Sequence, residues 1–131
     1  MSRSKLSVST DGPSVEDNRP KLPEGCSWQN DGSVLMVLGK SVPFTESSSA
    51  GERQSAVSEL VFRDLSAGDM IDMSEYRTPG ERTLFLMCAS TGRVGPAGEA
   101  LLRKMSARDY LKAGAIINVF TSAGPTTGTS A

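Results

Sequence analysis

The chain contains no histidine among its 131 residues. Without an imidazole it can form no Ser-His or Cys-His catalytic pair and no histidine-containing metal site. Its two cysteines, Cys26 and Cys88, lie far apart and lack Cys-x-x-Cys spacing, and two thiols do not complete a structural zinc site. We expect Cys88 to be a small apolar core residue and Cys26 a free surface thiol, with a disulfide between them as the alternative. The sequence thus predicts a protein that is not an enzyme and needs no metal or cofactor.

Aromatic residues and long apolar runs are also scarce, and the net charge is close to zero. Aromatics make up 5% of the chain, which predicts a small and mainly aliphatic core. The 14 basic and 15 acidic residues nearly cancel, and no Lys/Arg cluster stands out, so we expect no nucleic-acid partner. The longest apolar stretch, residues 34–38, is too short to cross a bilayer, and no apolar run follows the first basic residues. We therefore expect a soluble, intracellular protein that does not bind membranes.

Two sequence patterns invite a chemical interpretation. Residues 92–98 (GRVGPAG) superficially resemble a phosphate-binding loop, but no Lys-Ser/Thr follows and Pro96 removes one amide. We interpret this segment as a linker between helices. A group of acidic residues could act in acid/base chemistry or bind a divalent ion, although a solvated helix face is the favoured interpretation. These acids are Asp64, Asp69, Asp72 and Glu75.

The middle of the chain predicts a β-hairpin. Residues 34–38 form a short apolar run typical of a strand, and residues 42–44 extend it, with Pro43 marking an edge or a bend. Residues 45–56 are polar and predict a loop, and residues 57–63 predict a second strand. We expect the two strands to pair as an antiparallel hairpin with a long, mobile tip.

The rest of the ordered region predicts about four short helices. Two Ser-x-x-Asp sequences have the form of capping boxes, in which the Ser side chain and the acid satisfy free amides at a helix start. Thr78 followed by Pro79 marks another helix start, and Gly92 a helix end. The predicted structural caps are Ser66, Asp69, Ser106 and Asp109.

These elements define an α+β fold, an N-terminal antiparallel β-hairpin followed by about four short α-helices. We predict a disordered N-terminal arm over residues 1–25, because it is rich in polar residues and proline and shows no periodicity. A single α+β domain follows over residues 26–122. Residues 123–131 are low in apolar content and predict a flexible C-terminal tail.

Three segments carry a resemblance to a known family. Residues 60–70 (LVFRDLSAGDM) resemble the strand-to-helix junction of Mu-type phage tail assembly chaperones, which tends to read Leu-x-Leu-Arg-x-Pro-x-Ala-Gly-Asp-Leu. Residues 104–111 (KMSARDYL) are similar to the family's Leu-Ser-x-x-Asp-Tyr/Phe-x-x-Leu helix start, and residues 35–43 loosely resemble its opening strand. The resemblance covers roughly residues 34–120. The chain departs from the family in its N-terminal arm, its Ser-rich segment 45–56 and its glycine-rich segment 92–98.

The resemblance implies a non-enzymatic chaperone in tail assembly. Such proteins bind the long tape measure protein, keep it soluble and help recruit tail tube subunits; they act in the cytoplasm of the infected host cell and are generally absent from the finished virion. The resemblance is compatible with a homo-oligomer. The alternative is a minor structural virion protein of the tail tube or connector. Candidate partner-binding residues are Tyr110, Ile117, Phe120, Met73 and Met105. For any one of them, simple packing into the small core is the favoured alternative.

Overall fold

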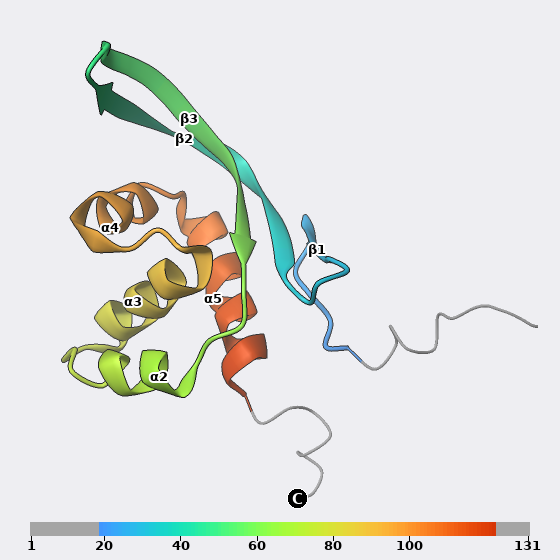
Figure 1. Ribbon diagram of the computed structural model, residues 1–131. Coiled ribbons are helices and arrows are strands. Elements are labelled where there is room, and N and C mark those ends of the chain that lie inside the picture. Colours follow the sequence, from blue (N-terminus) through green and yellow to red (C-terminus); the bar gives the residue numbers. More distant parts are fainter. Residues whose placement is uncertain (1–18, 123–131) are drawn as a thin grey trace, which may run out of the picture. The chain divides into compact units, whose positions relative to one another are not determined.

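In the computed structural model, residues 19–122 are described, and they contain an α+β fold of three antiparallel strands followed by four helices (Figure 1). This confirms the predicted fold class. The compact unit spans Leu22–Ser122. Most of the predicted N-terminal arm and the whole predicted C-terminal tail lie outside the described residues. The elements are β1 (Cys26–Trp28), β2 (Val34–Ser48), β3 (Gly51–Phe62), α2 (Ala67–Met73), α3 (Pro79–Thr91), α4 (Gly95–Arg103) and α5 (Ala107–Thr121).

The hairpin of β2 and β3 is much longer than predicted. Residues 45–56, expected as a loop, continue both strands up to the Ser48–Gly51 pair, and only residues 49 and 50 form the turn. Cross-strand polar pairs hold this part together: Arg53 forms an ion pair with Glu46. Figure 1 shows the end of the hairpin extending past the helices. The loop prediction was wrong because an arm that is exposed on both faces needs no apolar alternation, which is the signal that marks a half-buried strand.

The strand β1 was not predicted, and it is only three residues long. It pairs with β2 from Val34 to Met36, which makes β2 the central strand there. Farther along, Pro43 lies opposite Ala56 in a stretch of β2 paired only with β3. Because proline has no amide hydrogen to donate, it fits a strand with one free edge, as the sequence predicted.

The ordered unit begins earlier than the predicted boundary at residue 26. Leu22 packs against the core, and the Pro23 carbonyl accepts a hydrogen bond from the Cys26 amide. The Gly25 carbonyl accepts another from the Val37 amide at 2.9 Å. These contacts attach residues 22–25 to the sheet.

The core lies between the sheet and the helices. Its largest fully buried apolar side chains are Phe62, Met36, Met87, Leu102 and Ile116. Cys88 is buried as predicted, whereas Cys26 is half-buried, and both remain free thiols. The structure thus contains no disulfide between them.

The last helix buries one face. Leu111 lies outside this face and is 69% exposed. The buried apolar positions are Ala113, Ile116 and Ile117, with Phe120 half-buried one turn later. These follow the i, i+3, i+4, i+7 pattern of one helix face, which Leu111 does not share.

The helix ends largely follow the sequence prediction. The Ser66 hydroxyl accepts a hydrogen bond from the Asp69 amide and the Asp69 carboxylate accepts one from the Ser66 amide, so α2 begins with the predicted capping box. α3 begins in the same way at Thr78 and ends at Gly92, whose φ of 77° lies in the left-handed region.

Candidate functional site: an apolar groove between α3 and α4

The first part of the site is a hollow of about 300 Å³ between α3 and α4. α3 contributes Leu84, Phe85 and Cys88, whose i, i+1, i+4 spacing places them on one side of the helix. α4 contributes Pro96 and Glu99 from the opposite wall. Burial raises the pKa of the Cys88 thiol, so this side chain stays protonated and acts as an apolar lining group at neutral pH.

A second hollow of about 590 Å³ continues the first toward the start of α5. Glu81, Leu84 and Arg103 line both hollows, so the two form one groove. Met105 and Tyr110 line only the second part. We call the combined feature the α3–α4 groove.

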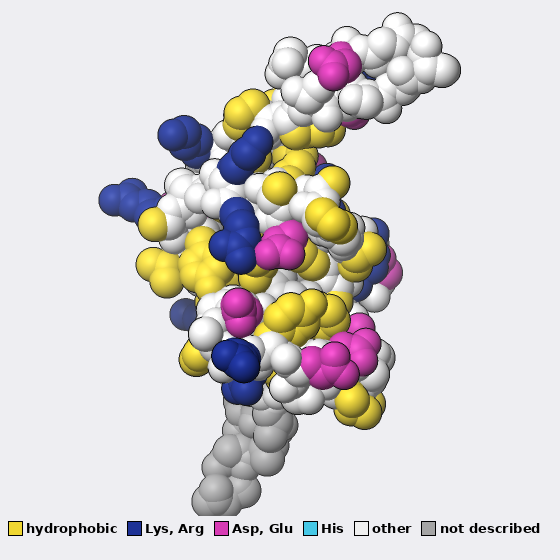
Figure 2. Space-filling view, turned by 90° about the vertical axis from the view of Figure 1, so that its left-hand side faces the viewer, with side chains coloured by type: hydrophobic (Ala, Val, Ile, Leu, Met, Phe, Trp, Pro, Cys, Tyr) yellow, Lys and Arg dark blue, Asp and Glu magenta, His cyan; other side chains and the backbone are white. Residues whose placement is uncertain are grey.

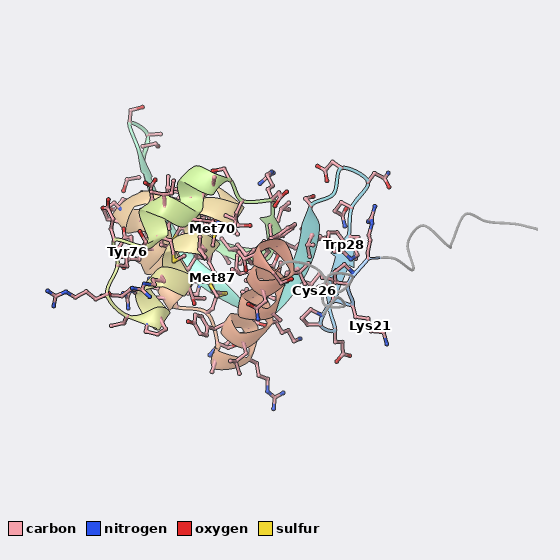
Figure 3. All side chains as sticks on the ribbon, turned by 90° about the horizontal axis from the view of Figure 1, so that it is seen from below. Lys21, Cys26, Trp28, Met70, Tyr76 and Met87 are labelled. Atoms are coloured by element: carbon pink, nitrogen blue, oxygen red, sulfur yellow. The ribbon has the colours of Figure 1, made fainter. Side chains whose placement is uncertain are left out.

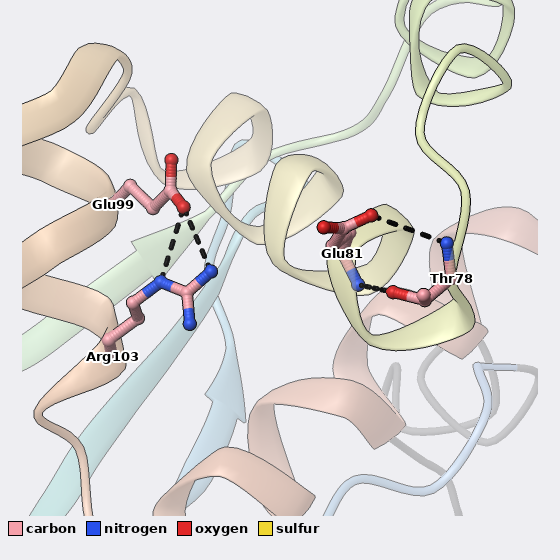
Figure 4. Close-up of polar contacts among 4 residues, drawn as sticks. All are labelled: Thr78, Glu81, Glu99 and Arg103. Atoms are coloured by element: carbon pink, nitrogen blue, oxygen red, sulfur yellow. Dashed lines mark hydrogen bonds and ion pairs between the residues drawn. The ribbon is translucent and has the colours of Figure 1, made fainter.

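The charged groups along this groove are engaged within the chain (Figure 4). Arg103 donates from Nε and one terminal nitrogen to the same Glu99 oxygen, at 3.2 and 3.0 Å. The Glu81 carboxylate accepts a hydrogen bond from the Thr78 amide at the start of α3. An exposed i,i+4 ion pair such as Arg103–Glu99 stabilises a helix by only about 0.3–0.5 kcal/mol. Here the ion pair and the cap bond give these charged side chains partners within the chain, beside the apolar lining.

Two exposed apolar side chains mark the first part of the groove. Tyr76 is 42% exposed and packs against Phe85, with ring centroids 5.3 Å apart. Val94 is 67% exposed and precedes α4. Figure 2 shows apolar side chains gathered over the helical part of one face, with acidic and basic groups beside them. Covering one such side chain with a partner is worth about 1.5–3 kcal/mol at most.

The predicted partner-binding residues do not form one site. Met105 and Tyr110 line the second part of the groove, although Met105 is largely buried. Ile117 is 4% exposed and belongs to the core, which was the favoured alternative for each of these residues. Phe120 packs edge to face on Trp28, with centroids 6.1 Å apart.

Met73 lies half-buried on α2 and packs against the core. Figure 3 shows Trp28 well separated from Tyr76, so the region around Phe120 is distinct from the groove. Sequence reasoning missed Tyr76, Phe85 and Val94 as surface candidates. The one available signal was Val94, a lone apolar residue within the glycine-rich linker.

Asp109 has a role different from the predicted capping box. Its amide donates to the Ser106 hydroxyl at 3.1 Å, which confirms Ser106 as the cap of α5. Its carboxylate, however, accepts hydrogen bonds from the backbone amides of Gly39 at 3.0 Å and Lys40 at 3.2 Å. Both amides lie at the irregularity between Val37 and Val42, where the β2–β3 pairing is interrupted. The residue, only 1% exposed, therefore joins α5 to the hairpin.

The other acidic residues lie on the surface near α2. Asp64, Asp72 and Glu75 are exposed and Asp69 serves its helix cap, as the solvated-face interpretation expected. Within residues 19–122, no three His, Cys, Asp or Glu side chains are grouped to hold a metal ion. In the same stretch, no helix has the length and apolar character needed to span a bilayer.

Comparisons with family models, with curated proteins and with solved structures give no match to this chain.

Proposed function

We propose that this protein is a phage tail assembly chaperone, which holds an apolar helical segment of the tape measure protein in the α3–α4 groove. The observation that carries the proposal is the continuity of the groove: two adjoining hollows share three lining residues, and apolar side chains dominate the lining. The resemblance of residues 60–70 and 104–111 to the chaperone family supplies the identity of the client.

The groove suits a helix more than an extended strand. α3 has 13 residues, about 20 Å at 1.5 Å per residue, so it can lie along three to four turns of a client helix. A client helix that places apolar residues at i, i+3, i+4 and i+7 would cover Tyr76, Phe85 and Val94. Few large side chains are involved, and this favours the reversible binding that a chaperone needs.

The proposal includes a place and a time of action. The protein binds its client in the host cytoplasm, assists recruitment of the tail tube protein and leaves before the virion is complete. The competing proposal, a minor tail tube or connector protein, requires the chain to remain in the particle. Mass spectrometry of purified virions separates the two, because only the structural protein is present in stoichiometric amounts.

Co-expression with the tape measure protein of the same genome tests the function directly. We expect the soluble fraction of the client to rise and the two proteins to co-purify. Val94→Asp should weaken binding about tenfold or more, since it replaces an exposed apolar contact with a carboxylate close to Glu99. Leu111→Asp is the matched control, because Leu111 is 69% exposed and lines none of the described hollows.

Three outcomes would count against the proposal. The first is a client that stays insoluble and does not co-purify. The second is an equal loss of binding in Val94→Asp and Leu111→Asp, which would mean that the groove has no special part in it. The third is the chain in purified virions.

A further inference from the structure

A further hollow of about 600 Å³ lies on the other side of α4, between that helix and β2, and it shares one lining residue, Val94, with the α3–α4 groove. Its apolar lining includes Phe44 from β2 and Ala97 and Leu101 from α4. The α3–α4 groove is lined instead by Pro96 and Glu99 of the same helix. α4 therefore separates two binding-sized hollows and presents a different side to each.

Among the residues that the structure describes, the charged side chains lining this hollow are both positive. They are Arg93 and Lys104, and no aspartate or glutamate of residues 19–122 lines it. Within residues 19–122, neither cation forms an ion pair, in contrast to Arg103, which is paired with Glu99. An apolar floor between two unpaired cations is complementary to a ligand that carries both apolar side chains and carboxylates.

The glycine-rich segment before and within α4 fixes the position of Arg93. Gly92 and Gly95 have φ values of 77° and 85°, which other residues rarely adopt. At Gly98 a Cβ atom would lie 2.0 Å from the Arg93 carbonyl oxygen, so only glycine allows this close approach. The segment that resembles a phosphate loop in sequence thus serves to hold the Arg93 backbone against the first turn of α4.

We propose that this basic hollow binds an acidic, apolar peptide segment of a partner protein. One or two carboxylates of the segment pair with Arg93 and Lys104, while its apolar side chains cover Phe44 and Ala97. The site is a second binding surface, beyond the client groove of the proposed function. A nucleic-acid ligand fits less well, because two cations on a chain of net charge -1 release few counterions.

Binding of fluorescently labelled peptides tests the proposal. The acidic probe is an amphipathic peptide of about three helical turns with leucines on one face and glutamates beside them. The basic probe has lysine in place of each glutamate, and a single-stranded oligonucleotide is the third probe. We expect the full-length protein to bind the acidic probe at least about tenfold more tightly than the basic probe, with an affinity that falls as salt is added.

Charge reversal locates the site. The double variant Arg93→Glu/Lys104→Glu should lose the acidic probe and gain the basic one, a reversal that partial unfolding would not produce. Arg108→Glu is the matched control, since Arg108 is exposed on α5 and lines none of the described hollows; it should retain the preference for the acidic probe. Equal affinity for the two peptides, equal effects of Arg108→Glu and the double variant, or tighter binding of the oligonucleotide would each overturn the proposal.

The same variants separate this inference from the proposed function. Arg93→Glu/Lys104→Glu leaves the lining of the α3–α4 groove unchanged, so solubilisation of the tape measure protein should persist. If the peptide experiment fails while solubilisation persists, only the basic hollow is rejected. If the peptides behave as expected but the client stays insoluble, the hollow stands and the chaperone function is rejected.

Discussion

Replacing Asp109 with alanine should destabilise the protein far more than its sequence context suggests. In sequence, Asp109 is the acid of a Ser-x-x-Asp helix start, the same pattern as Asp69. In the structure its carboxylate is 1% exposed and accepts hydrogen bonds from the amides of Gly39 and Lys40. Asp109→Ala removes both acceptor oxygens and leaves these two amides without their partner.

The expected loss of unfolding free energy is about 3 kcal/mol. A hydrogen bond to a charged group contributes about 1.5–3 kcal/mol, so two such bonds set an upper range of roughly 3–6 kcal/mol. Gly39 and Lys40 are themselves exposed residues, and water can therefore satisfy part of what the carboxylate loses. For this reason we take the lower end of the range.

Asp69→Ala provides the matched control. Its carboxylate accepts one hydrogen bond, from the Ser66 amide at 2.9 Å, at the exposed start of α2. Losing this part of a surface capping box should cost about 1 kcal/mol or less. The two variants remove the same group from the same sequence pattern, but the Asp69 carboxylate makes one local capping bond and the Asp109 carboxylate makes two tertiary ones.

Urea unfolding gives the free-energy differences, and amide hydrogen exchange shows where they originate. Asp109→Ala should selectively increase exchange at Gly39 and Lys40, whereas Asp69→Ala should not. Equal destabilisation by the two variants, or unchanged exchange at both amides, would refute the assignment of Asp109 as the link between α5 and the hairpin.

Further predictions concern two glycines and one carboxylate. Gly98→Ala should cost at least about 2 kcal/mol in urea unfolding, because its methyl group would overlap the Arg93 carbonyl. Gly80→Ala, which meets nothing within 4 Å inside α3, should instead stabilise by up to about 1 kcal/mol; destabilisation by both would contradict the packing argument. Hydrogen bonds from the Ser33 side chain and backbone lower the pKa of Asp31, so stability from this carboxylate is present above its unfolded pKa and is lost as the pH falls through its lower folded pKa. Ser33→Ala should raise the pKa of Asp31 toward its ordinary value, as NMR titration can measure, and an unchanged pKa would reject the role of the hydroxyl.

The fold was predictable where local and long-range forces agree. The starts of α2 and α3 depend on side chains three residues apart, so Ser66 and Thr78 mark them in the sequence alone. The outer half of the hairpin was not predictable by the same means. Residues 45–56 are mostly polar and mostly exposed along both strands of the ribbon, and polarity without alternation is also typical of a loop. What holds these residues in strands is their pairing with each other, through contacts such as Glu46 with Arg53.

The residues of the candidate site could also be predicted only in part from the sequence. The sequence analysis named both Tyr110 and Ile117 as candidate partner-binding residues, but it could not determine which of them the fold would bury. Three-dimensional packing decides this: Ile117 points into the core, while Tyr110 stays half-buried at the end of the groove.

Asp109 is the clearest case of a residue whose role the sequence did not predict. Its sequence pattern predicted a helix cap, but its carboxylate accepts hydrogen bonds from amides about 70 residues away in sequence. Those amides became available only because the β2–β3 pairing is interrupted between Val37 and Val42. The interrupted pairing thus supplies two free amides, and the buried carboxylate of Asp109 accepts their hydrogen bonds. Neither feature could be predicted from the sequence, because both depend on the packing of α5 against β2.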